Sequence, residues 1–117
     1  MTALDDEPVT EQLLASIAFR TQPHKRAEVL SAVDEVTRRM RQARGCARAR
    51  LLADAEDPNS FLILSEWLTS EDADVFFSSR DLQLFRGIRI LLRDEPVILL
   101  QEVRSQAVRL MRASNGT

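Results

Sequence analysis

Apolar and polar residues alternate along residues 13–21, the first strongly patterned stretch of the chain. A two-residue period places every second side chain on the same face of a strand, so this stretch is predicted to be a strand with one buried face. Pro23 ends it, because proline cannot donate to a sheet and holds the preceding residue extended. The predicted buried face carries Leu13, Ala15, Ile17 and Phe19, and the other face carries Ser16 and Arg20.

Residues 25–44 carry apolar side chains three and four positions apart, with charged residues between them. This spacing predicts an amphipathic helix. Acid-before-base pairs four residues apart, such as Glu35 with Arg39, support its solvent-facing side. Gly45 is predicted to follow the helix as its C-terminal cap, because glycine adopts positive φ without strain.

Two further strands are predicted at residues 46–53 and at residues 61 to 67 or 68. The intervening residues 54–60 are dense in turn formers, so the two strands are predicted to form a hairpin with a long loop. Its register is estimated from the symmetry of the loop alone. That register pairs Arg48 with Glu66, Ala49 with Ser65, and Ala47 with Trp67.

Two short helices are predicted after this hairpin. The first begins at Ser70, or one residue earlier with Thr69 as the capping residue. The second begins at Ser79 and ends before the Asp-Glu-Pro sequence at residues 94–96, although Gly87 weakens it. Its apolar side carries Leu82, Phe85, Ile88 and Leu92.

The last segment, residues 97–110, is apolar at first and then alternates loosely. As a strand it would be far longer than the usual ~5–6 residues. A strand that extends beyond its own sheet pairs most economically with a second copy of the chain. A helical C-terminal end is the alternative.

The predicted order is therefore β-α-β-β-α-β, an α+β ferredoxin-like fold with a four-stranded antiparallel sheet and helices on one face. The other face would expose apolar side chains unless a partner covered it. Two sheets packed face to face would form a dimeric α+β barrel. We expect one domain over residues 12–110, a flexible acidic lead-in over residues 1–11 and a flexible tail over residues 111–117.

The composition narrows the chemistry that this domain can perform. The chain has 117 residues, a formal net charge of −2, one tryptophan, one histidine, one cysteine and no tyrosine. One cysteine excludes an internal disulfide, and with a single histidine it excludes a structural zinc site. The balanced charge indicates no nucleic-acid partner, and no apolar run approaches the ~20 residues that span a membrane. The acidic N-terminus lacks the features of a secretory signal, so a cytoplasmic protein is expected.

Trp67 is the candidate catalytic residue, because its indole N–H could donate to a substrate oxygen; core packing is the alternative. The candidate pocket residues are Phe76, Phe77, Phe85, Arg48, Arg50 and Glu66. The phenylalanines either line an apolar pocket or belong to the core. The charged residues either bind an anionic or phenolate-like ligand or form surface ion pairs. His24 is interpreted as a solvated loop residue and Cys46 as a half-buried small apolar residue.

Several segments resemble a known family. Residues 61–73, Phe-Leu-Ile-Leu-Ser-Glu-Trp-Leu-Thr-Ser-Glu-Asp-Ala, combine a hydrophobic strand ending in Glu-Trp with an immediate Ser and acidic helix start. Ser79 lies twelve residues after the tryptophan, a Gly-Cys-Ala turn at 45–47 enters the second strand, and residues 54–60 contain an acidic Asp-Pro loop. Their order and spacing resemble the antibiotic biosynthesis monooxygenase superfamily over about residues 12–104.

The resemblance implies a homodimer that exchanges its long last strand, and a cavity between the sheet and the helices. Some members oxidise polycyclic aromatic intermediates with O2 and neither metal nor flavin, while others cleave haem or oxidise quinols. We therefore expect a cofactor-independent monooxygenase acting on an electron-rich aromatic or quinol-like small molecule. A non-catalytic dimeric module that binds a ligand or a partner is the alternative.

The chain departs from the family at several functional positions. Members often carry a histidine nine residues after the strand tryptophan, where this chain has Phe76. The haem-cleaving branch has tryptophan at that position and an axial histidine about ten residues later, where this chain has Arg86. The branch that oxidises aromatics uses asparagine, tryptophan and tyrosine. Of that set only Trp67 has a counterpart here, since Asn59 lies in a loop and Asn115 in the tail.

Overall fold

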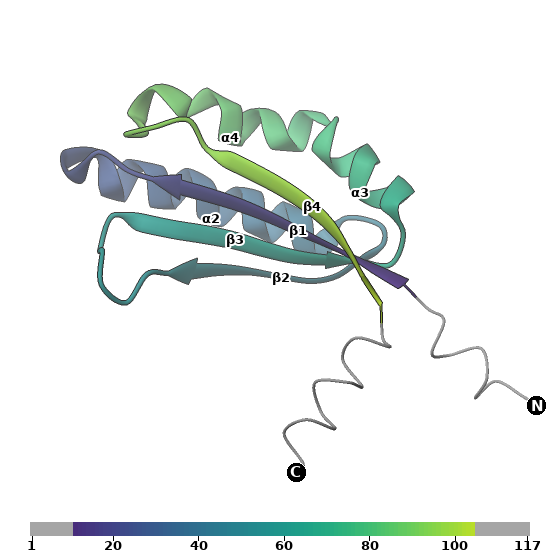
Figure 1. Cartoon of the computed structure of the whole chain (residues 1–117). Helices are drawn as coiled ribbons and strands as arrows, with labels where there is room; N and C mark the ends of the chain where they lie inside the picture. Colours follow the sequence, from purple (N-terminus) through teal and green to yellow (C-terminus); the bar gives the residue numbers. More distant parts are fainter. Residues whose placement is uncertain (1–10, 105–117) are drawn as a thin grey trace, which may run out of the picture.

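The computed structural model describes residues 11–104 and contains the predicted α+β ferredoxin-like fold. The four strands form one antiparallel sheet in the order β2-β3-β1-β4. Figure 1 shows the helices on one side of this sheet. The strands are β1 (Glu11–Arg20), β2 (Cys46–Ala53), β3 (Ser60–Trp67) and β4 (Val97–Arg104). The α-helices are α2 (Arg26–Gln42), α3 (Ser70–Phe77) and α4 (Gln83–Gly87), and the 3₁₀ turns are η2 (Pro23–Lys25), η3 (Arg80–Leu82) and η4 (Arg89–Leu91).

Strand β4 agrees with the predicted last strand over that strand's first eight residues. Residues 105–110, the remainder of that prediction, lie outside the described residues. The predicted tail and residues 1–10 of the predicted lead-in also lie outside them. Glu11, the last residue of that lead-in, is the first residue of β1.

The core lies between the helices and one face of the sheet. The alternation predicted for β1 is confirmed, because its apolar residues at odd positions are buried and Arg20 is exposed. Strand β3 repeats the pattern, and the buried side of α2 contributes to the same core. The buried side chains from these elements are Leu13, Ala15, Ile17, Phe19, Phe61, Ile63, Ser65, Trp67, Val29, Val33, Val36, Thr37 and Met40.

The register predicted for the hairpin is confirmed for two pairs and wrong for the third. Arg48 lies opposite Glu66 and Ala49 opposite Ser65, as predicted. The partner of Trp67 is Cys46 and not Ala47, because the register shifts between Cys46 and Arg48. A bulge adds one residue to β2 at this point, which symmetry about the loop does not foresee.

Two helix boundaries differ from prediction. Helix α2 ends at Gln42, so Gly45 is not its cap and instead takes φ 82° in the turn before β2. The Asp72 carboxylate lies so close that a Cβ at Gly45 would meet its Oδ2 at 2.2 Å. For α3 the structure selects the earlier of the two proposed starts, since Thr69 Oγ1 accepts a hydrogen bond from Asp72 N at 3.1 Å.

The single helix predicted from Ser79 to Leu92 is wrong, because the chain forms η3, α4 and η4 there. Ser79 does cap the first of these turns, its hydroxyl accepting from Asp81 N at 3.2 Å. Helix α4 stops at Gly87, where the low helix propensity of glycine favours a break. The apolar positions still face inward, so the core contacts predicted for this segment are kept.

The opposite face of the sheet has no helix over it among the described residues (Figure 1). Its exposed or half-buried apolar residues are Leu14, Ala18, Leu52, Leu62, Leu64, Val97 and Leu99, which we call the open face. None of the described helices is long and apolar enough to cross a membrane.

Candidate functional site

Trp67 is the last residue of β3 and points to the helix side of the sheet, where it is 0% exposed. Its indole Nε1–H donates to Ser65 Oγ at 2.9 Å. The Ser65 hydroxyl in turn donates to the carbonyl oxygen of Ala15 at 3.4 Å. Small residues at 15 and 65 on adjacent strands leave room for the indole above them. The candidate donor is thus already paired inside the core.

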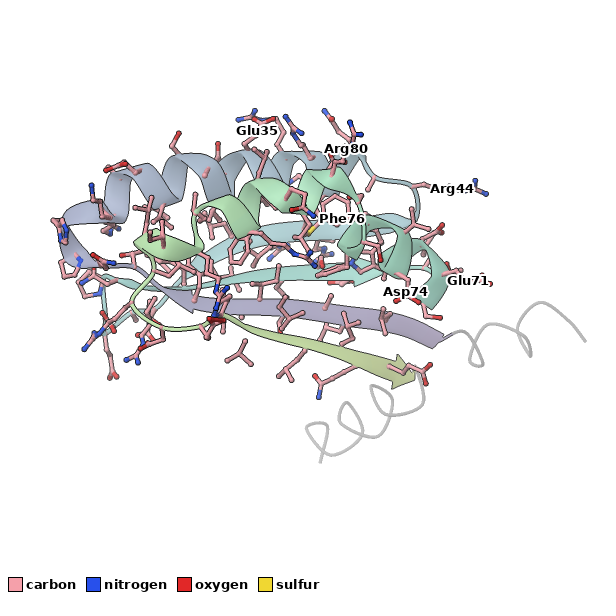
Figure 2. All side chains as sticks on the ribbon, turned by 90° about the horizontal axis from the view of Figure 1, so that it is seen from above. Glu35, Arg44, Glu71, Asp74, Phe76 and Arg80 are labelled. Atoms are coloured by element: carbon pink, nitrogen blue, oxygen red, sulfur yellow. The ribbon has the colours of Figure 1, made fainter. Side chains whose placement is uncertain are left out.

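Two phenylalanines of α3 pack on this indole. The ring centres of Trp67 and Phe76 are 5.6 Å apart, and those of Trp67 and Phe77 are 6.2 Å apart with the rings edge to face. The Phe76 side chain is buried, while Glu71 and Asp74 of the same helix are exposed and lie at the outer edge of α3 in Figure 2. Phe77 is half-buried and forms the solvent edge of this group. We call these three rings the aromatic cluster.

Phe85, the fourth aromatic candidate, lies in a different group. Its ring meets Phe19 edge to face at 5.6 Å, and Phe19 stacks on Phe61 at 5.7 Å. The Arg26 guanidinium covers Phe61 at 5.3 Å from the ring centre. The structure therefore separates Phe85 from the aromatic cluster.

The charged candidates lie on the other side of the sheet from Trp67. Arg48 Nε and Glu66 Oε2 are 3.8 Å apart, and both residues are partly exposed. Arg50 lies opposite Leu64 in the sheet and is exposed. A partly solvated pair of this kind contributes about 0–1 kcal/mol. These residues cannot face one ligand together with the Trp67 indole of the same chain.

The remaining reactive side chains do not join the aromatic cluster. His24 lies exposed in η2. Cys46 Sγ–H donates to the Arg48 carbonyl oxygen at 3.4 Å, and burial raises the pKa of the thiol, which disfavours the nucleophilic thiolate. Within residues 11–104 no group of three or more potential ligands could hold a metal ion.

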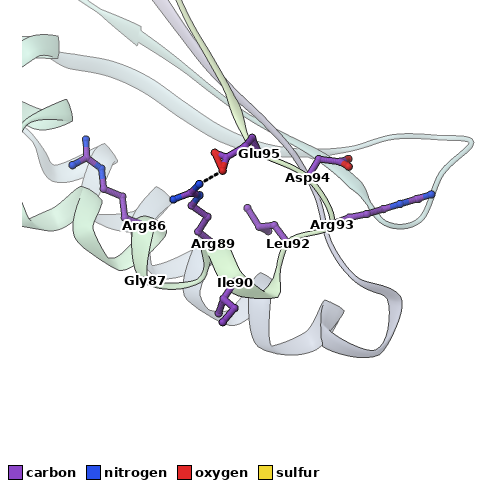
Figure 3. Close-up of a pocket in the computed structure, with 8 residues that line it drawn as sticks. All are labelled: Arg86, Gly87, Arg89, Ile90, Leu92, Arg93, Asp94 and Glu95. Atoms are coloured by element: carbon purple, nitrogen blue, oxygen red, sulfur yellow. Dashed lines mark hydrogen bonds and ion pairs between the residues drawn. The ribbon is translucent and has the colours of Figure 1, made fainter.

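The structure also contains a hollow that the sequence analysis did not predict. It measures about 600 Å³ and lies where α4 and η4 turn back into β4 (Figure 3). Arginines 86, 89 and 93 contribute to its lining, together with Leu92, Asp94 and Glu95. The arginine spacing was visible in the sequence. Because one continuous helix was predicted for this segment, the turn that brings these residues around the hollow was not foreseen.

Comparison with known proteins places this geometry among related folds. A family model described as antibiotic biosynthesis monooxygenase matches residues 13–87. A solved antibiotic biosynthesis monooxygenase aligns with a TM-score of 0.71 at 22% identity, covering 76% of this chain and 95% of the other. A conserved protein from Methanosarcina mazei gives 0.74 at 17% identity with coverages of 79% and 92%. A protein from Mycobacterium tuberculosis gives 0.71 at 15% identity with coverages of 77% and 92%. A search of curated proteins found no match.

Proposed function

Because the chain belongs to the antibiotic biosynthesis monooxygenase family, we propose that it is a cofactor-independent monooxygenase acting on an electron-rich aromatic or quinol-like small molecule. The family match carries this proposal. It spans β1, α2, the hairpin, α3 and α4, and so includes the whole aromatic cluster. We place the activity in the cytoplasm, where a chain whose one cysteine is unpaired needs no disulfide.

We place the substrate at the aromatic cluster. Phe77 is the ring through which a planar substrate can reach it, since Trp67 and Phe76 lie beneath the surface. Aromatic rings favour offset or edge-to-face contact with a polycyclic substrate. For Trp67 to donate to a substrate oxygen, its N–H must leave Ser65 Oγ, which keeps its own bond to the Ala15 carbonyl.

The proposed reaction takes its electrons from the substrate. An anthrone-type substrate loses a proton from its methylene carbon, and the carbanion reduces O2. One oxygen atom becomes the new ketone oxygen, and the other leaves as water with the two hydrogens of the methylene group. One substrate molecule and one O2 thus give one ketone and one water. The protein would contribute by holding the ionised substrate in one orientation and by keeping bulk water away from it.

Oxygen uptake tests this proposal. Purified full-length protein is mixed in air with a panel of anthrones and quinols, and the rate is compared with the rate without protein. We expect accelerated uptake for at least one substrate and a loss of roughly tenfold or more in Trp67→Phe. Phe85→Leu is the matched control, since it alters a buried ring of the other aromatic group and is expected to keep the activity.

Circular dichroism establishes that each variant is folded before its rate is compared. Uptake no faster than the uncatalysed rate across the panel would eliminate the monooxygenase. Unchanged turnover in folded Trp67→Phe would remove this residue from the chemistry.

The second candidate is a non-catalytic dimeric module of the same fold that binds a ligand or a partner. The observation that favours it is the complete burial of Trp67 and the pairing of its N–H with Ser65. A core of this kind needs no substrate to satisfy its polar groups. This candidate predicts no oxygen uptake with any panel member, together with the homodimer described next.

We propose a homodimer formed through the open face and β4. The four apolar residues that begin β4 support it, because they are uncovered on both faces of the sheet. Ile98 and Leu100, on the helix side, are 43% and 44% exposed, and Val97 and Leu99, on the open face, are 55% and 52% exposed. An edge strand of this composition invites pairing unless a partner covers it. A second copy would cover the open face in the symmetric way that most oligomers adopt.

A further inference from the structure

The hollow at the α4–β4 turn lies far from the aromatic cluster. Leu92 pairs with Thr21 in an isolated bridge, whereas Trp67 pairs with Leu13 at the other end of β1. Eight residues of extended chain separate those two positions, about 27 Å at ~3.4 Å per residue. A ligand in the hollow would therefore not touch the cluster.

The charges around the hollow leave a positive excess. Asp94 is held by Arg20, whose Nε donates to Asp94 Oδ2 at 2.7 Å. Glu95 is paired with Arg89 (Figure 3). Within the described residues, Arg86 and Arg93 make no ion pair with a carboxylate. Each acid of the lining is thus matched by one arginine. Of the two arginines that are left, Figure 3 shows Arg93 directed away from Arg89, which leaves Arg86 for an external anion.

The wall of the hollow is held rigidly by the segment that follows β1. Arg93 N donates to the Arg20 carbonyl oxygen at 2.8 Å, and Gln22 N donates to the Leu91 carbonyl oxygen at 3.2 Å. The Gln22 side chain adds a bond from Nε2 to the Ile90 carbonyl oxygen at 3.2 Å. Because the frame is fixed before any ligand arrives, little ordering free energy opposes binding.

The contact between Glu95 and Arg89 shows that Arg89 can bind a carboxylate at this position. Its carboxylate lies on the guanidinium of Arg89, and Figure 3 shows this pair beside Leu92. Both partners are exposed, with side-chain exposures of 63% and 67%, so the pair contributes at most about 1 kcal/mol. An external carboxylate can replace Glu95 at small cost, and the planar guanidinium fork matches its two oxygens.

We propose that this hollow binds a small organic carboxylate. Its anionic group pairs with Arg89 in place of Glu95 and with Arg86, and its apolar part covers the small part of Leu92 that the core leaves exposed. The volume falls within the ~300–1,000 Å³ of small-molecule sites. For a ligand of about thirteen heavy atoms on so open a surface, a Kd near ~1 mM is expected.

A nuclear magnetic resonance titration of the ¹⁵N-labelled full chain with 2-naphthoate tests the site. We expect saturable shifts in the amides of residues 86–95, and weaker binding as salt is added. The neutral analogue 2-naphthalenemethanol is expected to leave these amides unchanged. Equal shifts with both compounds, or naphthoate shifts that map only to the aromatic cluster, would overturn the proposal.

Two substitutions with opposite expected effects sharpen this test. Arg89→Gln should weaken naphthoate binding about two- to fivefold, whereas Glu95→Gln should tighten it by a similar factor by freeing Arg89. Arg80→Gln removes an exposed arginine outside the hollow and should leave the affinity unchanged. If Arg89→Gln and Arg80→Gln weaken binding equally, the anion responds only to overall charge and the site does not exist.

Discussion

The bond between Trp67 and Ser65 shows how one buried pair governs the candidate site. Ser65→Ala would leave the indole N–H buried without an acceptor, at a cost of about 1–3 kcal/mol. In a Trp67→Phe background the same change should cost much less, because no N–H remains to be satisfied. Urea denaturation of the two single variants and the double variant measures this coupling.

Ser31→Ala, on the exposed side of α2, is the control and should change stability by less than ~0.5 kcal/mol. Equal stability of Ser65→Ala and the parent chain would contradict the assignment.

Gly45 is the second residue whose identity the structure fixes. Gly45→Ala should lower the free energy of unfolding by about 1–2 kcal/mol from the positive φ alone, and by more from the contact with Asp72. Adding Asp72→Ala should restore only the share of the second part that comes from the carboxylate, because the Asp72 Cβ would remain 2.6 Å from the added Cβ. Thermal and urea unfolding measure the stability of the single and the double variant. Gly87→Ala is the matched control: a Cβ there meets nothing within 4 Å, so this substitution should be neutral or stabilising. A Gly45→Ala variant as stable as the Gly87→Ala variant would be incompatible with this geometry.

Among the contacts between elements, Arg39 links α2 to η3. Its guanidinium donates to the Glu35 carboxylate of its own helix at 2.9 Å and to the Asp81 carboxylate of η3 at 3.1 Å. The hydrogen bond from Arg39, aided by the charge of Arg38, lowers the pKa of Glu35 below its ordinary value. A lowered native pKa means that the unfolded chain takes up the proton first as the pH falls. The stabilisation by Glu35 is therefore present above the ordinary carboxylate pKa and is lost as the pH falls through the native value.

Glu35→Gln should therefore make the free energy of unfolding fall less steeply as the pH is lowered. We expect the urea midpoints of parent and variant to differ most near neutral pH and to converge once the pH has fallen through the lowered native pKa of Glu35. Asp74→Asn, which changes an exposed carboxylate of α3, is the control and should leave the pH profile parallel to that of the parent. A Glu35→Gln profile parallel to the parent's at every pH would exclude the assigned role of this pair.

The elements that the sequence predicted well are those whose pattern is local. Alternation in residues 13–21 identified β1 and its buried face, and Thr69 with Asp72 contained the information for the start of α3. The bulge in β2 was not predictable, because it depends on how the strand fits against β3. The prediction of one helix after Ser79 was wrong for a similar reason. Tertiary packing keeps the apolar positions of this segment inward through η3, α4 and η4.

The candidate site was less predictable than the fold, because sequence spacing does not say which face of the sheet a residue occupies relative to a distant one. Trp67 and Glu66 are neighbours in sequence and point to opposite sides of the sheet. Phe77 and Phe85 share a helical spacing and belong to different aromatic groups. The resemblance named the family correctly, but the roles of individual residues stay predictions for the oxygen-uptake test.

Across the molecule, the two faces of the sheet differ in what covers them. The helix side is a closed core except along β4, where Ile98 and Leu100 are partly exposed, and the open face keeps a band of leucine and valine at the surface. A stable interface covers about 800 Å² on each partner, and its fully buried centre is more apolar than the surrounding surface. The centre of the open face is apolar, as the centre of such an interface is. Its polar rim is supplied by Arg48, Arg50 and Glu66, which lie toward one end.

The proposed homodimer makes a definite prediction for this face. The parent chain should sediment at twice its mass of 13.3 kDa, and Leu99→Glu should weaken the dimer at least tenfold, because the new carboxylate would lose its hydration in the interface. Val75→Glu is the matched control, since Val75 is exposed at 69% on α3, away from the open face, and its substitution should leave the dimer intact. Analytical ultracentrifugation over a hundredfold range of concentration measures each equilibrium. A parent chain that stays monomeric throughout would refute the dimer, and dissociation by Val75→Glu alone would move the interface to the helix side.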